Sequence, residues 1–176
     1  FKINKGSLKK GFFEKNFPGL KDSKKLTEKK REEFFIKLQV LRKEGFVDFS
    51  VSLISEKIID EKGISFAIKF GMEKCLKKVG VKVSDKILLD GGLKVSQIFK
   101  NQKTIIKGDE KEPTISLASI CAKVTRDRFM KKEALKYPDF GFEVHKGYGT
   151  KKHRESIEKL GLTKIHRKSF CKKVRV

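Results

Sequence analysis

The chain of 176 residues has only three cysteines, Cys75, Cys121 and Cys171, and they are widely spaced. An odd number of distant cysteines does not make a disulfide framework, so we expect a protein of the reducing cytoplasm. No two cysteines form a C-x-x-C pair, and the three histidines lack zinc-ligand spacing relative to them. The sequence therefore predicts no structural zinc site.

Long apolar runs are missing as well. No run approaches the ~20 residues that a membrane-spanning helix needs, and no signal-peptide pattern is visible. We therefore expect a cytoplasmic protein with no part in a membrane.

Acidic residues are scarce relative to basic ones. The chain has 22 Asp and Glu against 44 Lys and Arg, which gives a formal net charge of +22. Such a surplus favours a polyanionic partner, because each cation near a phosphate releases condensed counterions. A lysine-rich proteome would produce the same surplus without functional meaning, so charge alone leaves the partner open.

Apolar periodicity and turn signals predict helices that alternate with strands, which indicates an α/β protein. The length suits a single domain over residues 1–176, with a helical segment from about 138 to 176 packed on it. Helices are expected over residues 28–44, 64–79, 114–137 and 151–160, the first and last capped by Thr27 and Thr150. Strands are expected over residues 47–53, 87–89 and 104–106, with loops or turns over 1–21, 55–60 and 140–149.

Two carboxylates are candidates for a metal site. Asp90 ends a buried apolar run just before two glycines, at the end of a strand where α/β proteins bind ligands. Asp127 lies in a basic helix beside Lys123 and Arg126. If the two carboxylates converge, they suit Mg²⁺ or Mn²⁺, which take oxygen ligands and substrate phosphates. The alternatives are a turn-forming Asp-Gly pair and a salt-bridged surface aspartate.

Three basic segments are candidates for nucleic-acid contacts. Ser23, Lys24 and Lys25 precede a helix and offer a hydroxyl, backbone amides and ammonium groups to a phosphate, although such a short segment is more often a solvated charge run. Tyr148 lies between two glycines beside Lys146, and it either stacks on a sugar or base or forms a packing lid. Residues 165–170 are either a basic contact or a tail docked on the core.

Several motifs occur together in a particular order. They are LKDSKKLTEKKR at 20–31, IDE at 59–61, LDG at 89–91, KGD at 107–109, ASI at 118–120, AKVTRDR at 122–128, HKGY at 145–148 and IHRKSF at 165–170. In this order the set resembles ribonuclease HII, the bacterial type 2 ribonuclease H, from about residue 18 onwards.

The resemblance implies an RNase H-like fold with a central mixed sheet flanked by helices. It also implies cleavage of the RNA strand of RNA–DNA hybrids and of ribonucleotides embedded in duplex DNA, by a monomer. In that family four carboxylates hold two Mg²⁺ or Mn²⁺ ions, and cleavage leaves 3′-hydroxyl and 5′-phosphate ends. Asp90 and Asp127 fall on the third and fourth carboxylates, and Tyr148 falls on a tyrosine that stacks against deoxyribose. The phosphate-contacting loop corresponds to Ser23, Lys24 and Lys25, and Lys123, Arg126 and Lys146 add basic groups.

The sequence departs from the family at one motif. The Asp-Glu-Ala-Gly-Arg-Gly segment of the family's first strand, which carries the other two carboxylates, is absent from these residues. We expect that the sequence starts after that strand and that the chain alone has little or no nuclease activity. Metal-dependent cleavage abolished by Asp90→Asn would indicate that other groups, such as Asp109 or Glu110, replace the missing pair. The alternative function is a non-catalytic, basic nucleic-acid-binding protein, either a decayed homologue or a ribosomal-type module.

Overall fold

The computed structural model describes residues 1–4 and 9–172, and residues 5–8 and 173–176 lie outside the described part. The contacts divide the chain into two compact units. Unit 1 comprises residues 1–52 and 69–124, and unit 2 comprises residues 53–68 and 125–176. We describe each unit by itself, and the expectation of a single domain stays a prediction.

The strands of unit 1 form two pairs. Strands β1 (Lys2–Ile3) and β2 (Val47–Asp48) are antiparallel, and strands β3 (Ile87–Asp90) and β4 (Gln102–Ile105) are parallel. In the parallel pair Asp90 lies opposite Ile105, so the carboxyl ends of both strands lie at the same edge. The chain thus combines helices with one antiparallel and one parallel pair of strands, which confirms the α/β class.

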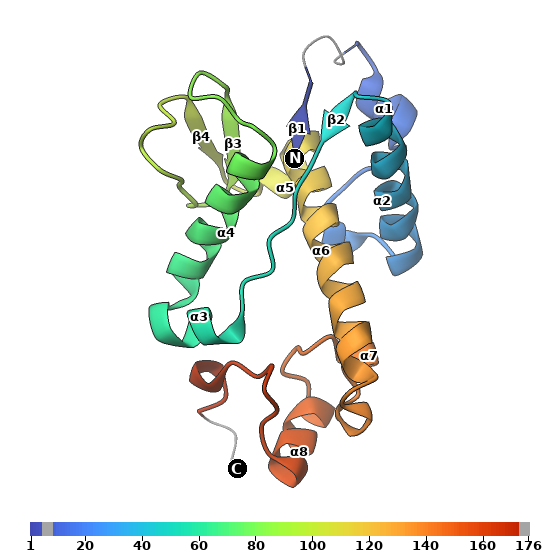
Figure 1. The fold of residues 1–176 in the computed structure, drawn as a ribbon. Coiled ribbons are helices and arrows are strands. Elements are labelled where there is room, and N and C mark those ends of the chain that lie inside the picture. Colours follow the sequence, from blue (N-terminus) through green and yellow to red (C-terminus); the bar gives the residue numbers. More distant parts are fainter. Residues whose placement is uncertain (5–8, 173–176) are drawn as a thin grey trace. The chain divides into compact units, whose positions relative to one another are not determined.

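The helices of unit 1 bury their apolar faces in two clusters. Helix α2 (Glu28–Lys43) and the first half of α6 (Pro113–Ala134) pack together around Leu38, Leu117 and Ile120, which are fully buried. Helix α4 (Ile64–Lys78), which begins in unit 2, packs its second half on Ile87 and Leu89 of β3. Short helices α1 (Phe12–Asn16), η1 (Ser23–Lys25) and α5 (Gly108–Lys111) complete the unit (Figure 1).

Unit 2 is helical within its described residues. It contains α3 (Glu56–Lys62), the second half of α6, η2 (Pro138–Phe140), α7 (Phe142–His145), α8 (Lys151–Leu160) and η3 (Lys168–Phe170). Its core consists of Met130, Ala134, Phe140, Phe142 and Ile157, and the rings of Phe140 and Phe142 are stacked 5.3 Å apart. The expected helical C-terminal segment is therefore confirmed as far as residue 172.

Local sequence signals fix several element boundaries as expected. The hydroxyls of Thr27 and Thr150 accept hydrogen bonds from the backbone N–H groups of Lys30 and His153, which caps α2 and α8. Pro113 occupies the first position of α6, where its missing N–H leaves no bond unmade. Helix α6 ends at Ala134, slightly earlier than expected.

Other expectations about the elements were wrong. Residues 1–21 were expected to be a loop, but their described part contains β1 and α1, and residues 55–60 begin a true helix capped by Ser55. The strand expected over 47–53 stops at Asp48, which pairs with Lys2, the first residue of β1, and the next N–H, that of Phe49, donates to the Asp48 carboxylate at 2.8 Å. The loop expected over 140–149 contains α7, a single helical turn.

Membrane insertion has no support in the described residues, where no helix combines the length and the apolar character that crossing a bilayer requires.

Candidate active site

Two carboxylates of unit 1 come together at the end of the parallel strand pair. Asp90 is the last residue of β3, and its Oδ1 accepts a hydrogen bond of 2.8 Å from the backbone N–H of Gly108. The next residue, Asp109, lies in the first turn of α5. The loop that follows β4 therefore brings Asp109 to Asp90, which lies nineteen positions earlier in the chain.

This approach depends on Gly108. A Cβ at residue 108 would lie 2.6 Å from Cδ1 of Ile115 and 3.3 Å from Oδ1 of Asp90. The residue before it, Lys107, has a left-handed backbone with φ of 54°, which is uncommon for a residue other than glycine. The KGD segment is thus shaped so that an unsubstituted backbone amide can reach the Asp90 carboxylate.

The electrostatics of Asp109 reflect its neighbours. Burial raises its pKa, and the nearby carboxylates of Asp90 and Asp22 raise it further, while Lys24 acts in the opposite direction. Neighbouring like charges that raise a pKa favour a bound cation. Asp109 also lines a cavity of about 450 Å³ with Lys21 and Ser116, which leaves space beside the carboxylate.

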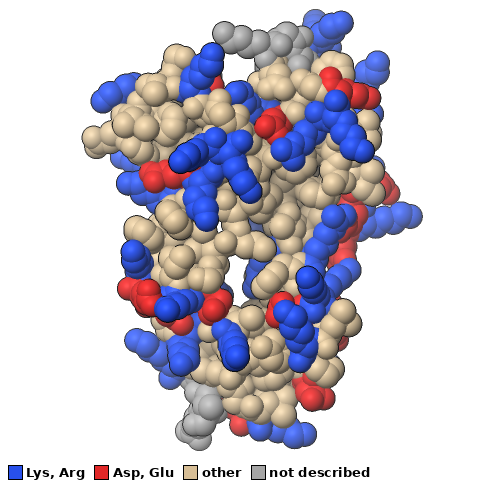
Figure 2. Space-filling model, viewed as in Figure 1, with Lys and Arg blue, Asp and Glu red and all other residues tan. Residues whose placement is uncertain are grey.

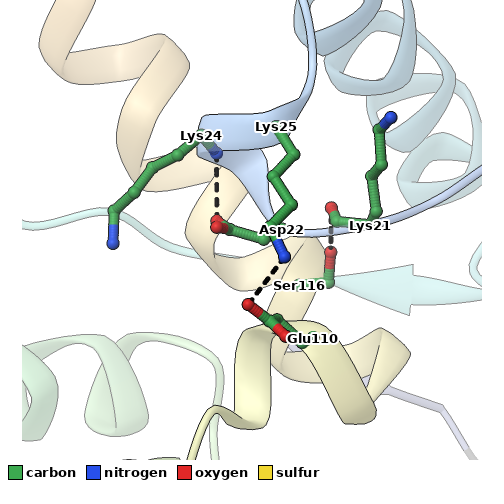
Figure 3. Close-up of polar contacts among 6 residues, drawn as sticks. All are labelled: Lys21, Asp22, Lys24, Lys25, Glu110 and Ser116. Carbon is green, nitrogen blue, oxygen red and sulfur yellow. Dashed lines mark hydrogen bonds and ion pairs between the residues drawn. The ribbon is translucent and has the colours of Figure 1, made fainter.

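The third acidic residue of this group, Asp22, lies in the predicted phosphate-binding loop. Its Oδ1 accepts the N–H of Lys24 at 3.0 Å and so begins the η1 turn (Figure 3). In the same loop Nζ of Lys25 lies 2.8 Å from Oε1 of Glu110 on α5, and this ion pair raises the pKa of Lys25 and lowers that of Glu110. Both side chains are solvent-exposed, so the ion pair adds little stability, but it joins the loop to the helix that carries Asp109.

Serines hold this loop against α6. The hydroxyl of Ser116 donates to the carbonyl of Lys21 at 2.8 Å, and the hydroxyls of Ser23 and Ser119 lie 2.8 Å apart. Ser23 is buried, whereas Lys24 and Lys25 are exposed. The structure therefore gives Ser23 an anchoring contact and leaves the two lysines accessible to a phosphate, and direct binding by Ser23 stays a prediction.

The other predicted carboxylate belongs to unit 2. Asp127 lies on α6 and is only 4% exposed, so its description as a surface aspartate is wrong. Because Asp90 and Asp127 belong to different units, their convergence on one ion stays a prediction. Lys123, the neighbouring basic residue, belongs to unit 1, while Arg126 belongs to unit 2.

The tyrosine loop of unit 2 has a tightly specified backbone. Tyr148 is 63% exposed, and its stacking role stays a prediction. Lys146 is buried, has a φ of 51° and donates from Nζ to the carbonyl of Glu143, so its proposed contact with nucleic acid stays a prediction. Gly147 has a φ of 79°, and a Cβ there would lie 3.3 Å from the guanidinium of Arg126.

Three histidines, His145, His153 and His166, form a cluster next to Tyr148 (the histidine relay), in which His153 and His166 are hydrogen-bonded to each other and His145 stacks on His153. Nδ1 of His153 lies 2.9 Å from the carbonyl of Tyr148, and its Nε2 lies 3.1 Å from Nε2 of His166. Nδ1 of His166 accepts the N–H of Thr163 at 2.8 Å. Because a carbonyl only accepts and an N–H only donates, His153 carries its proton on Nδ1 and His166 carries its proton on Nε2.

The third histidine closes the other side of the loop. Nε2 of His145 lies 2.7 Å from the carbonyl of Phe140, and its Nδ1 accepts the N–H of Gly147 at 3.1 Å. The rings of His145 and His153 stack 4.3 Å apart. His145 thus donates from Nε2 and accepts at Nδ1, and together with His153 it fixes the backbone of the Tyr148 loop.

The donor set of unit 1 suits an oxygen-seeking divalent ion. Asp90 and Asp109 supply carboxylate oxygens, and mutual repulsion between the acidic groups is relieved by a cation. Within residues 1–4 and 9–172, however, no group of three or more His, Cys, Asp or Glu side chains has the arrangement of a metal site. The two carboxylates thus fit a site that waters and substrate phosphates complete, as is usual for Mg²⁺.

Lysine and arginine are the prevailing charged residues of this chain. The face drawn in Figure 2 carries many more basic than acidic side chains, as the net charge of +22 requires. The structure adds Asp109, Asp22 and Gly108 to the residues expected at the site. Asp109 had been considered only as a substitute ligand, although the KGD motif next to a strand end was the signal that could have identified it.

Comparisons with known proteins agree with these observations. Residues 11–173 match the family model described as Ribonuclease HII. Ribonuclease HII of Caldicellulosiruptor bescii is 44% identical over 156 residues, which cover 89% of this chain and 73% of that protein. Ribonuclease HII of Clostridioides difficile is 45% identical over 159 residues, which cover 89% of this chain and 59% of that protein.

Solved structures show the same likeness. The ribonuclease H2 from Pyrococcus horikoshii OT3 has a TM-score of 0.72 and 27% identity, with 92% of this chain and 82% of that chain covered. The ribonuclease HII in a complex with PCNA from Archaeoglobus fulgidus has a TM-score of 0.64 and 25% identity, with 86% and 77% covered. These likenesses confirm the expected RNase H-like fold class.

Proposed function

The chain belongs to the ribonuclease HII family, and we propose that it is an endoribonuclease that hydrolyses the RNA strand of RNA–DNA hybrids with divalent metal ions. The observation that carries the proposal is the pair Asp90 and Asp109, assembled at a strand end through the N–H of Gly108. We further propose that the substrates include single ribonucleotides in duplex DNA. The proposed metal is a pair of Mg²⁺ or Mn²⁺ ions, and the proposed products carry a 5′-phosphate.

The residues of unit 1 have distinct tasks in this proposal. Asp90 and Asp109 hold the metal, which when bound supplies an activated water and stabilises the departing 3′ oxygen. Gly108 orients the Asp90 carboxylate through its N–H, and Lys24 and Lys25 attract the phosphate backbone. Ser23, Ser116 and Ser119 hold residues 21–25, which we call the lysine loop, on α6.

The residues of unit 2 contribute the sugar contact. The exposed ring of Tyr148 is proposed to stack on the deoxyribose at the RNA–DNA junction, and the histidine relay holds the backbone beneath it. Asp127 is proposed as a further carboxylate on the strength of the family motif alone. We also propose a cytoplasmic monomer, which is consistent with the free thiols of Cys75, Cys121 and Cys171.

Two substitutions decide which carboxylates act. With the chain in excess over a labelled duplex that contains one ribonucleotide, we expect Asp90→Asn and Asp109→Asn to lower metal-dependent cleavage about 100-fold. Asp85→Asn is the matched control, because Asp85 lies in a turn before β3, where its carboxylate accepts the N–H of Lys82. Loss of cleavage in Asp127→Asn but not in Asp109→Asn would instead support the assignment made from the sequence.

The same assay separates the enzyme from the alternative. An excess of the chain makes slow cleavage measurable, so it also tests the expectation of weak activity. Binding of the duplex without any metal-dependent cleavage would favour a non-catalytic nucleic-acid-binding protein. Binding should weaken steeply with salt under either function and therefore does not choose between them.

A further inference from the structure

A second cavity is lined entirely by described residues of unit 2. It has a volume of about 610 Å³, which is in the range of small-molecule sites. Its apolar lining comes from α6, α7, α8 and the segment before η3, and it includes Phe129, Met130, Phe142, Ile157 and Ile165. The proposed cleavage reaction does not use this cavity as a binding site, although Arg126 and residues 165–170, which contribute to its lining, were expected to contact nucleic acid.

Three arginines from three segments line this cavity. They are Arg126 on α6, Arg154 on α8 and Arg167 just before η3. Among the described residues none of the three forms an ion pair with a carboxylate: Arg126 contacts the carbonyl of Lys146 at 3.5 Å, and Arg167 lies over the ring of Phe170 at 4.1 Å. Among the described residues that line the cavity, Glu56 alone is acidic.

Two of these arginines, Arg126 and Arg167, which are both partly buried, repel each other. Burial lowers the pKa of Arg126, and the charge of Arg167 lowers it further, while the attraction of Asp127 is a weaker effect. Partly buried guanidinium groups that face a common space are stabilised by an anion, and the planar fork of arginine matches phosphate oxygens in particular. The arginines of the lining therefore favour a ligand with an anionic group, and the apolar side chains favour a ligand that also has an apolar or aromatic part.

We propose that this cavity binds a nucleoside monophosphate, with Arg126, Arg154 and Arg167 on the phosphate and the base against the phenylalanine-rich wall. The same chemistry is present in a free nucleotide and in the 5′-phosphorylated end of a nucleic-acid strand. Two phenylalanine rings lie next to the arginines that are proposed to bind the phosphate. The ring centre of Phe129 is 5.9 Å from the guanidinium of Arg126, and that of Phe170 is 4.1 Å from the guanidinium of Arg167. Aromatic rings in such positions offer stacking surfaces to a base.

Calorimetric titration with AMP tests this site. The titration uses the full chain in EDTA, so that neither metal nor cleavage is involved and the outcome is independent of the proposed function. We expect saturable binding of AMP, weaker binding of inorganic phosphate, and little binding of adenosine. We expect Arg126→Gln, Arg154→Gln and Arg167→Gln each to weaken AMP binding by about tenfold or more, because each removes a charge-assisted hydrogen bond.

Arg128→Gln is the matched control, because Arg128 lies on α6 next to the site but does not line the cavity. It should bind AMP as the parent chain does, and an equal loss there would overturn the proposal in favour of diffuse charge. Arg154 is exposed on α8, so its substitution tests the site even if the more buried Arg126 variant fails to fold. Absence of saturable AMP binding by the folded parent chain would also overturn the proposal.

A dinucleotide with and without a 5′-phosphate distinguishes the two ligand sources. Binding of the phosphorylated dinucleotide together with AMP identifies a site for strand ends, whereas binding of AMP alone identifies a site for free nucleotides. Both results support the cavity as a phosphate-monoester site. Equal binding of the phosphorylated and unphosphorylated dinucleotides would contradict it.

Discussion

Acidification should destabilise unit 2 through the histidine relay. In the relay each of the three rings already uses both nitrogens, one as donor and one as acceptor. A proton added to Nδ1 of His166 would face the N–H of Thr163, and one added to Nε2 of His153 would face the N–H of His166. The folded protein therefore resists protonation that the unfolded chain accepts freely.

The magnitude follows from the pKa of His166. Burial is the main cause that lowers this pKa, and His153 lowers it further, to about 4 from an ordinary value of 6.5. Because the folded pKa is the lower one, stability is fully present above about pH 6.5 and is lost as the pH falls towards about 4. Linkage then gives a loss of about 2 kcal/mol in the free energy of unfolding between about pH 7.5 and pH 5.

The true loss is expected to be smaller. His166 lines the 610 Å³ cavity with Arg126, Arg154, Arg167 and Glu56, so solvent reaches one side of the ring. Burial also lowers the pKa of His153, so the two rings share part of the same effect. We therefore expect a measured loss of about 1–2 kcal/mol for the pair.

Urea unfolding at pH 7.5 and pH 5.0 measures this loss. His166→Gln removes the titrating ring and should reduce the difference between the two pH values, although its stability at pH 7.5 is lower. Carboxylates with ordinary pKa values change little in this interval, so they contribute equally to both proteins. An equal loss in the variant, or a titration of His166 near 6.5 by NMR, would refute the reasoning.

Three further substitutions test the sites directly. Gly108→Ala places a Cβ 2.6 Å from Ile115 and should lower the free energy of unfolding by about 1–3 kcal/mol and remove most of the cleavage. The control Gly92→Ala, which has open space around its Cβ, should lose little stability. Equal melting temperatures of the two variants would argue against the close approach at Gly108. Asp60→Ala removes the acceptor of the N–H groups of Lys168 and Ser169, so their amide hydrogen exchange should accelerate relative to the parent chain, and unchanged exchange would contradict this anchoring. Tyr148→Ala should weaken junction cleavage more than duplex binding while Tyr148→Phe keeps both, and equal losses in both measurements would exclude the stacking role.

Local signals in the sequence determined the helices and their ends. Thr27, Thr150 and Pro113 act on backbone groups within a few residues of themselves, so their effect can be read without knowledge of the fold. The sequence motifs likewise indicated the family, and the alternation of helices and strands indicated the α/β class. Both conclusions are confirmed.

Tertiary structure alone decided which side chains share a site. Asp22 and Asp109 are far apart in the sequence, and only the packing of the lysine loop on α6 and α5 places their charges near each other. The contacts of the histidine relay, from Phe140 and Tyr148 to Thr163, likewise depend on particular hydrogen bonds. Periodicity reports which face of an element is apolar, but the partner of a polar group depends on distances that only the folded chain defines.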